Sequence, residues 1–147
     1  MKKLPWKYLA GLIDGEGCID VQVNQKVYIR PRLRITMTEP GREVLTYAHN
    51  SYGGFLCERK AKDARWTDSI SWECTGYKHA CPILRNVFNH LFIKKEQARF
   101  CLWLEQNIKG QRVSAEVRDA VRKELKLMKR DPHRLSEKAG ETIRRLL

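Results

Sequence analysis

The chain has 147 residues, of which 42% are hydrophobic, and its formal net charge is +12. This length corresponds to one domain of about 150 residues, and the hydrophobic content excludes an intrinsically disordered chain. No apolar run approaches the roughly 20 residues that cross a bilayer, and the N-terminus does not resemble a signal peptide, so we expect an intracellular protein, cytoplasmic or organellar, without a membrane partner.

Residues 5–14 predict a helix that begins near Pro5, because apolar side chains recur there at helical spacing. Gly11 and Gly15 lie four residues apart, inside and just after this segment. Each glycine in a helix costs about 1 kcal/mol relative to Ala. A close approach by another backbone against this face would compensate for that cost.

Residues 17–38 predict a β-hairpin with its turn at Asn24-Gln25-Lys26, because polar and apolar side chains alternate with a period of two. The polar face of the first strand comprises Cys18, Asp20, Gln22 and Asn24. The polar face of the second strand comprises Tyr28, Arg30, Arg32, Arg34 and Thr36. Pro31 cannot donate to a ladder, so it predicts an edge position or a local irregularity.

A helix over 39–51 and a second hairpin over 55–76 follow. The return strand of this hairpin alternates and places Thr67, Ser69, Ser71, Glu73 and Thr75 on one face. The outgoing strand alternates poorly, so its register leaves either Arg59 or Lys60 on that face. An α-β-β unit therefore occurs twice, which predicts an α+β fold with a four-stranded antiparallel sheet.

From residue 77 onward the pattern is helical. Pro82 begins one helix and residues 94–106 continue the pattern, with a loop near residues 107–112. Ser114 is expected to cap the next helix, which Asp131-Pro132 ends, and Ser136 opens a last short one.

The five cysteines are scattered without a CxxC pair, and the four histidines form no metal-ligand group. We expect the cysteines to be buried, reduced thiols. The charge indicates a polyanionic partner, most often nucleic acid. Residues 1–75 carry 12 basic and 9 acidic side chains, whereas residues 76–147 carry 17 and 8.

Residues 9–17 read LAGLIDGEG and closely resemble the defining motif of the LAGLIDADG homing endonucleases, with Gly for Ala at position 15 and Glu for Asp at position 16. The segment IKKEQA around Lys94 also resembles that family. The resemblance implies the αββαββα homing-endonuclease fold, as a single domain over 1–147 with a core at about 5–107 and a C-terminal helical extension at about 113–147. Family members with one motif act as homodimers, which implies a dimer interface made by Leu9, Gly11, Leu12 and Gly15.

The resemblance also implies the catalytic groups. Glu16 from each subunit would be an essential metal ligand, and Gly15 would contribute its backbone carbonyl. Mg²⁺ suits such oxygen ligands; Mn²⁺ is expected to support cleavage, and Ca²⁺ to permit binding without it. Lys94 would assist near the scissile phosphate. Glu39 falls where relatives often place a water-positioning Gln, but a helix-start acid explains it equally well.

The polar faces of the two hairpins predict a DNA-reading surface, because Arg pairs with guanine and Gln or Asn with adenine in the major groove. Its candidate residues are Asp20, Gln22, Asn24, Tyr28, Arg30, Arg32, Arg34, Thr36, Arg42, Arg59, Arg65, Ser69, Ser71, Glu73 and Thr75. Basic residues of the C-terminal tail are candidates for phosphate contacts or for solvated helix faces: Lys109, Arg112, Lys138, Arg144 and Arg145.

The expected function is therefore site-specific cleavage of double-stranded DNA at a long pseudo-palindromic target, with divalent metal ions and a homodimer. An intron RNA-splicing maturase, with intron RNA as partner, or a non-cleaving DNA-binding protein is the alternative on the same fold. The presence of both Glu16 and Lys94 favours a working hydrolytic site over a decayed one.

Overall fold

The computed structural model describes residues 2–147 and confirms the predicted α+β fold class. Four antiparallel strands form one sheet in the order β1-β2-β4-β3. Its strands are β1 (Gly17–Asn24), β2 (Tyr28–Thr38), β3 (Phe55–Arg59) and β4 (Ser69–Thr75). The helices are α1 (Trp6–Glu16), α2 (Arg42–Tyr52), α3 (Ala80–Val87), α4 (Lys95–Ile108), α5 (Ala115–Arg130) and α6 (Ser136–Leu146).

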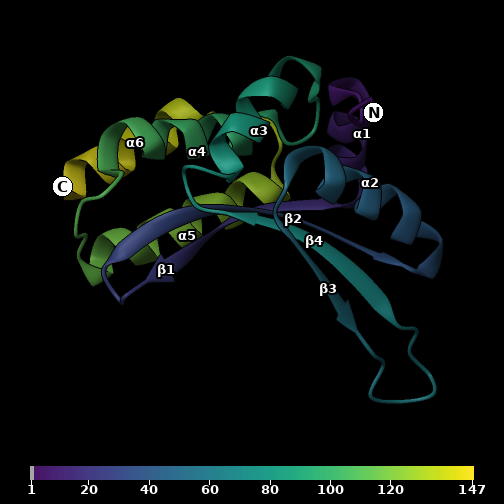
Figure 1. Cartoon of the computed structure of the whole chain (residues 1–147). Helices are drawn as coiled ribbons and strands as arrows, with labels where there is room; N and C mark the ends of the chain where they lie inside the picture. The colour runs from purple at the N-terminus through teal and green to yellow at the C-terminus, as the bar shows by residue number, and fades with distance from the viewer. Residues whose placement is uncertain (1) are drawn as a thin grey trace.

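The helices cover one face of the sheet and leave the other face uncovered (Figure 1). Helices α1 to α4 and α6 lie above the sheet in this view, and α5 runs beside β1 at the sheet edge. We call the uncovered side the open face. It carries every second side chain of each strand. These rows begin at Cys18 on β1, at Tyr28 on β2, at Phe55 on β3 and at Ser69 on β4.

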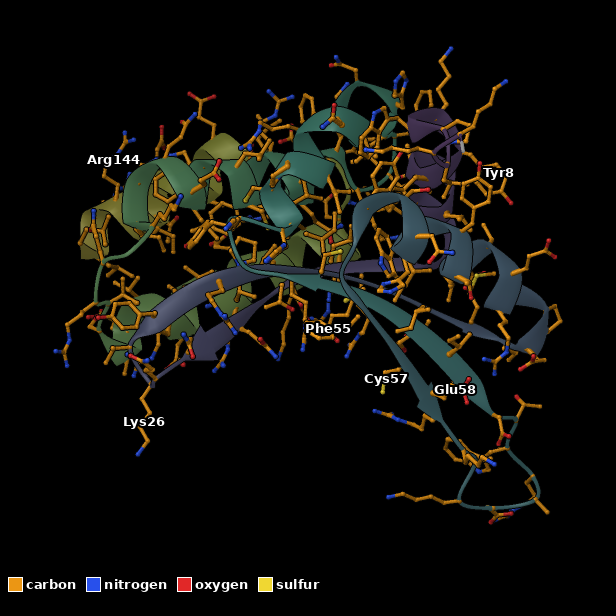
Figure 2. All side chains as sticks on the ribbon, in the orientation of Figure 1. Tyr8, Lys26, Phe55, Cys57, Glu58 and Arg144 are labelled. Carbon is orange, nitrogen blue, oxygen red and sulfur yellow. The ribbon has the colours of Figure 1, made fainter. Side chains whose placement is uncertain are left out.

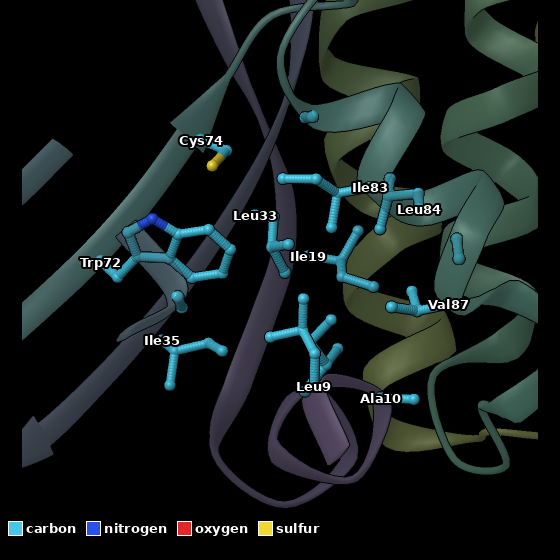
Figure 3. Close-up of a cluster of buried hydrophobic side chains, with 14 of the residues drawn as sticks. Leu9, Ala10, Ile19, Leu33, Ile35, Trp72, Cys74, Ile83, Leu84 and Val87 are labelled. Carbon is cyan, nitrogen blue, oxygen red and sulfur yellow. The ribbon is translucent and has the colours of Figure 1, made fainter. Parts of the chain in front are cut away.

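The core lies between the sheet and the helices. Leu9 of α1, Ile19 of β1, Leu33 of β2 and Trp72 of β4 are fully buried in one cluster (Figure 3). The alternation in β1, β2 and β4 thus follows from burial on one face only. Among residues 2–147, no helix is long and apolar enough to cross a membrane.

The first hairpin has the predicted turn. The backbone N–H of Val27 donates to the carbonyl of Asn24, and both intervening residues, Gln25 and Lys26, have positive φ angles of 51° and 66°. Two such angles define the turn type that matches the twist of the flanking strands. This turn sets the register that pairs Gln22 with Arg30.

Pro31 does not make β2 an edge strand, because β2 pairs with β1 on one side and with β4 on the other. The ladder with β4 runs from Arg32 to Thr38, however, and ends just before Pro31. At Pro31 the strand has only β1 as a ladder neighbour, and the Pro31 carbonyl accepts a hydrogen bond from Gly76 N–H. The missing N–H therefore costs no bond to β4.

The second hairpin shows why its register was ambiguous. Strand β3 is short, and most of its side chains are exposed on both faces, so burial imposes no alternation. Arg59 lies opposite Ser69 and shares the open face, which excludes Lys60 from that row. Thr67 lies before β4 begins and is not part of the sheet.

The cysteine prediction was partly wrong. Cys74, Cys81 and Cys101 are buried, but Cys18 is half-buried and Cys57 is exposed, and all five are free thiols. Burial raises the pKa of Cys74 and Cys81 to about 12. The buried thiols therefore stay protonated and behave as small apolar side chains.

The C-terminal helices begin close to where the sequence predicts. The Ser114 side chain accepts a hydrogen bond from the Val117 N–H at 3.2 Å and caps α5, as expected. The helix predicted from Pro82 begins two residues earlier, at Ala80. Similarly, the segment over 39–51 starts with a 3₁₀ turn, Glu39–Gly41, before α2.

Candidate functional site

The C-terminal end of α1 passes directly into β1, and Glu16 is the last residue of the helix. Gly17 follows, and a Cβ at this position would lie 2.7 Å from the Ile13 carbonyl oxygen. The junction therefore requires glycine. Glu16 is exposed, and its carboxylate has no hydrogen bond or ion pair to any of the residues 2–147.

Asp14, two residues before the end of α1, ties a distant segment to this junction. Its carboxylate accepts hydrogen bonds from the backbone N–H groups of Phe92 at 2.8 Å, Ile93 at 3.2 Å and Lys94 at 3.0 Å. In return, Lys94 Nζ donates to the backbone carbonyl of Asp14 at 2.8 Å. Asp14 thus holds Lys94 beside the end of α1, a role that sequence reasoning did not assign to it.

Lys94 is half-buried at the start of α4. Burial lowers the pKa of its ammonium group, against the opposing charge of Asp14. Further contributions come from Cys18, Lys129 and Glu16, so these groups lie within electrostatic reach of Lys94. Lys129, near the end of α5, also places its Nζ 3.1 Å from the Cys18 sulfur. We call this cluster the α1 corner: Asp14, Glu16, Cys18, Lys94 and Lys129.

The exposed side of α1 is an apolar stripe with small residues. Tyr8, Gly11, Leu12 and Gly15 follow one another at the spacing of one helix face, and Tyr8 is 55% exposed (Figure 2). A Cβ at Gly11 or at Gly15 would meet no atom of residues 2–147 within 4 Å, the helix's own backbone aside. Within the described part of the chain, no close contact therefore explains the two glycines.

An exposed apolar segment lies at the end of α1, and one predicted interface residue does not belong to the stripe. Asp14 holds the Phe92–Ile93 backbone at the end of α1, and Phe92 is 89% exposed. Leu9, in contrast, is fully buried in the chain's own core. The prediction that Leu9 faces a partner subunit is wrong, because its side chain lies on the opposite face of α1.

Glu39 and Arg42 pair with each other. The Arg42 guanidinium donates to the Glu39 carboxylate at 2.7 and 3.0 Å and also to Glu58. Arg42 lowers the pKa of Glu39. Within residues 2–147, neither residue has a hydrogen bond or ion pair to Glu16 or Lys94.

The open face carries the predicted polar rows in register. Arg32 donates to Asp20 through two nitrogens, at 2.8 and 2.7 Å, and its third nitrogen lies 3.9 Å from Glu73. Arg30 donates more weakly to Gln22, at 3.3 Å. Thr36 and Ser71 share a hydrogen bond of 2.7 Å between their hydroxyl groups.

The remaining candidates are dispersed along this face and beyond it. Arg34 pairs across the ladder with Cys18 on β1 and with Glu73 on β4. Arg65 lies outside the strands and forms an ion pair with Asp63 in its own loop. Asn24, Tyr28, Arg59, Ser69 and Thr75 occupy the ends of the ladders on the open face.

The tail residue Arg144 is not part of the open face. It projects from the helical layer, on the side of the molecule away from Lys26 and Cys57 (Figure 2). Its guanidinium carbon lies 5.8 Å from the centre of the Trp103 ring. Arg144 therefore cannot reach a ligand that lies on the open face.

A family model described as LAGLIDADG endonuclease matches residues 9–107. No curated protein sequence matches the chain. Among solved structures, the homing endonuclease I-CvuI in complex with the I-CreI target and 2 mM Mg is similar with a TM-score of 0.66 and 21% identity, over 96% of this chain and 93% of that chain. A second I-CvuI complex, with its own target and 2 mM Ca, has a TM-score of 0.66 and 20% identity, over 96% of this chain and 93% of that chain.

A larger protein is similar over half its length. The LAGLIDADG homing endonuclease I-GzeII in complex with its DNA target has a TM-score of 0.56 and 16% identity, over 91% of this chain and 50% of that chain. At these identities the likeness shows a common fold. The match of the family model covers residues of the α1 junction, both hairpins and Lys94.

Proposed function

Because the chain belongs to the LAGLIDADG endonuclease family, we propose that it is a homodimeric homing endonuclease that cleaves both strands of a long, pseudo-palindromic DNA site with a divalent metal ion. The observation that carries this proposal is the α1 corner. There Glu16 ends the motif helix with an exposed carboxylate that has no ion pair within residues 2–147. Asp14, two residues earlier, holds Lys94 at the same end of the helix.

The donor set at this end of α1 fits a hard divalent cation. Glu16 offers a carboxylate, and Gly15 lies in the last helical turn, where backbone carbonyls lack helical partners. Mg²⁺ prefers such oxygen ligands and keeps several waters. When bound, the ion supplies an activated water and stabilises charge on the attacked phosphate.

Each chain offers one carboxylate at this position, and Mg²⁺ is usually held by one or two carboxylates together with waters and substrate phosphates. Among residues 2–147, no group of three or more His, Cys, Asp or Glu side chains is arranged to hold a metal ion. A second Glu16, from a partner subunit, would supply another carboxylate if two copies of α1 pack against each other. Two carboxylates brought together repel each other unless a cation lies between them.

The apolar stripe on α1 is the proposed contact between the two copies. Tyr8, Gly11, Leu12 and Gly15 form this surface. Glycines on a helix face permit close approach of a second helix. A two-fold axis through this contact brings the same surface of both subunits together and makes the two halves of the DNA target symmetric.

Replacement of Gly11 by Leu should abolish dimerisation without unfolding the subunit. Among residues 2–147, the new Cβ meets no atom outside the helix's own backbone within 4 Å, and Leu favours a helix over Gly by up to about 1 kcal/mol. Sedimentation velocity should therefore report a folded monomer that no longer cleaves DNA. Lys138→Leu, on the exposed face of α6, is the matched control and should stay dimeric. A dimeric Gly11→Leu protein would exclude this interface.

The open face is the proposed base-reading surface. Side chains two residues apart on a strand repeat at about 6.6–6.8 Å, so successive rows reach different base pairs. Asp20 fixes the guanidinium of Arg32 from one edge, and this contact raises the pKa of Arg32. The remaining nitrogen, 3.9 Å from Glu73, would turn from that carboxylate to pair with a guanine.

Metal removal tests the hydrolytic part of the proposal. Cleavage should disappear in EDTA, return when Mg²⁺ is added and also occur with Mn²⁺. Ca²⁺ should support DNA binding without cleavage, because it accepts more ligands and looser geometry than Mg²⁺. Cleavage assays and gel-shift titrations on one DNA site measure both effects. Unchanged cleavage in EDTA would refute metal dependence.

A further inference from the structure

Three basic residues of α5 form a stripe beside the open face. Arg122, Lys126 and Lys129 are spaced four and three residues apart, so they lie on one face of the helix. Together with Asp20 and Val21 of β1 they line a surface hollow of about 300 Å³. Because the Asp20 side chain belongs to the open face, the hollow lies where that face meets α5.

The stripe ends at the α1 corner. Lys129 Nζ lies 3.1 Å from the sulfur of Cys18, two residues after Glu16. Arg122, at the other end, lies two helical turns away, about 10 Å along the axis. Phosphates of one DNA strand advance by about 3.4 Å each along the duplex axis. The stripe is therefore long enough to follow about three phosphates.

The charges of the stripe are not neutralised inside the chain. All three side chains are exposed, and none forms an ion pair with a carboxylate of residues 2–147. Elsewhere on the surface, arginines do have such partners, as Arg32 has Asp20 and Arg42 has Glu39. Three unpaired cations in a row repel one another, and a polyanion laid along them would remove that repulsion.

We propose that Arg122, Lys126 and Lys129 form a track for the DNA phosphate backbone, with Lys129 binding the phosphate next to Glu16. This inference rests on the proposed function, because that function places the DNA on the open face and the cleaved bond at the α1 corner. Arg122 and Lys126 position the backbone, and Lys129 acts on the attacked phosphate as a second cation beside Lys94.

The salt dependence of DNA binding tests the track. Each phosphate contact contributes about 0.9 to the slope of log K against log salt concentration. Arg122→Gln, Lys126→Gln and Lys129→Gln each remove two contacts per dimer, so each should reduce the slope by about 1.8, measured in Ca²⁺ to prevent cleavage. Lys129→Gln should also slow cleavage of fully bound DNA in Mg²⁺ by tenfold or more.

Lys123→Gln is the matched control, since Lys123 is exposed on α5 but does not line the hollow. Its slope and its cleavage rate should equal those of the unmodified protein. Unchanged slopes in all three stripe variants would overturn the track, and unchanged cleavage by Lys129→Gln would overturn the role of Lys129. If the unmodified protein itself neither binds nor cleaves DNA, the proposed function fails, which is a different result.

Discussion

Replacement of Glu16 by Gln should abolish DNA cleavage and leave DNA binding intact. The exchange removes the negative charge that holds the metal ion but keeps the size of the side chain. Charge stabilisation by a metal ion is worth several kcal/mol, and each 1.36 kcal/mol is tenfold in rate. We therefore expect a loss of at least about 1,000-fold in the cleavage rate.

The fold should not suffer from this change. Glu16 is exposed and forms no hydrogen bond or ion pair with residues 2–147. Removing two like charges from the proposed interface should also leave the dimer at least as stable. Glu137→Gln, on the exposed face of α6, is the control and should cleave normally. Full Mg²⁺-dependent cleavage by Glu16→Gln would remove Glu16 from the site.

Replacement of Asp14 by Ala should reduce both stability and cleavage. It leaves three backbone N–H groups, those of Phe92, Ile93 and Lys94, without their acceptor. Hydrogen bonds to a charged group contribute about 1.5–3 kcal/mol each, less where solvent can replace them. Because two of these three bonds are exposed, we expect a loss of about 2 kcal/mol in the free energy of unfolding, measured with urea.

Cleavage should fall because the Asp14 contacts position Lys94. Lys94→Met should slow cleavage by about 100-fold, the usual effect of losing one group that stabilises transition-state charge. Asp14→Asn keeps one carbonyl oxygen as an acceptor and should keep the fold. Its cleavage should be slower than that of the unmodified protein, but by less than the roughly 100-fold loss expected for Lys94→Met. If Asp14 acts through Lys94, the double variant Asp14→Asn/Lys94→Met should cleave little more slowly than Lys94→Met alone. Independent, multiplying effects would show that Asp14 acts by another route.

The sheet was predictable from sequence where one face is buried and the other is not. The period of two in β1, β2 and β4 reflects Ile19, Leu33 and Trp72, which point into the core. Strand β3 lacks this contrast, so its register emerges only from its pairing with β4. Of the two alternatives that Pro31 left open, the structure shows the local irregularity, because the ladder with β4 ends partway along an interior strand.

Within the candidate site, the motif and the segment around Lys94 predicted Glu16 and Lys94 as site residues, but not the contacts around them. Asp14 acts on residues 78 to 80 positions away, and no local pattern predicts such a contact. Helical spacing alone also left open which face of α1 turns inward, and Leu9 was assigned to the wrong one. The pairing of Arg32 with Asp20 depends on the register of two strands, which the turn at Gln25-Lys26 sets.

The exposed cations on α5 show the same limit. The sequence indicated a basic C-terminal half, and its candidates for phosphate contacts were Lys109, Arg112, Lys138, Arg144 and Arg145. Of these, Arg144 projects from the helical layer. Arg122, Lys126 and Lys129 gain their importance from the packing of α5 against β1, which brings Lys129 to Cys18. A count of charges cannot distinguish the cations of α5 from Arg144. The fold does so, because it places the α5 cations beside the open face and Arg144 away from it.

Sequencing of the cleaved ends from a randomised DNA library in Mg²⁺ tests the central claim most directly. The unmodified protein should enrich one long motif with two-fold pseudo-symmetry, cut on both strands near its centre. The same library treated with Glu16→Gln should yield no such ends. Cleaved ends without a symmetric motif, or the same ends from both proteins, would contradict a homodimeric endonuclease with Glu16 at its active site.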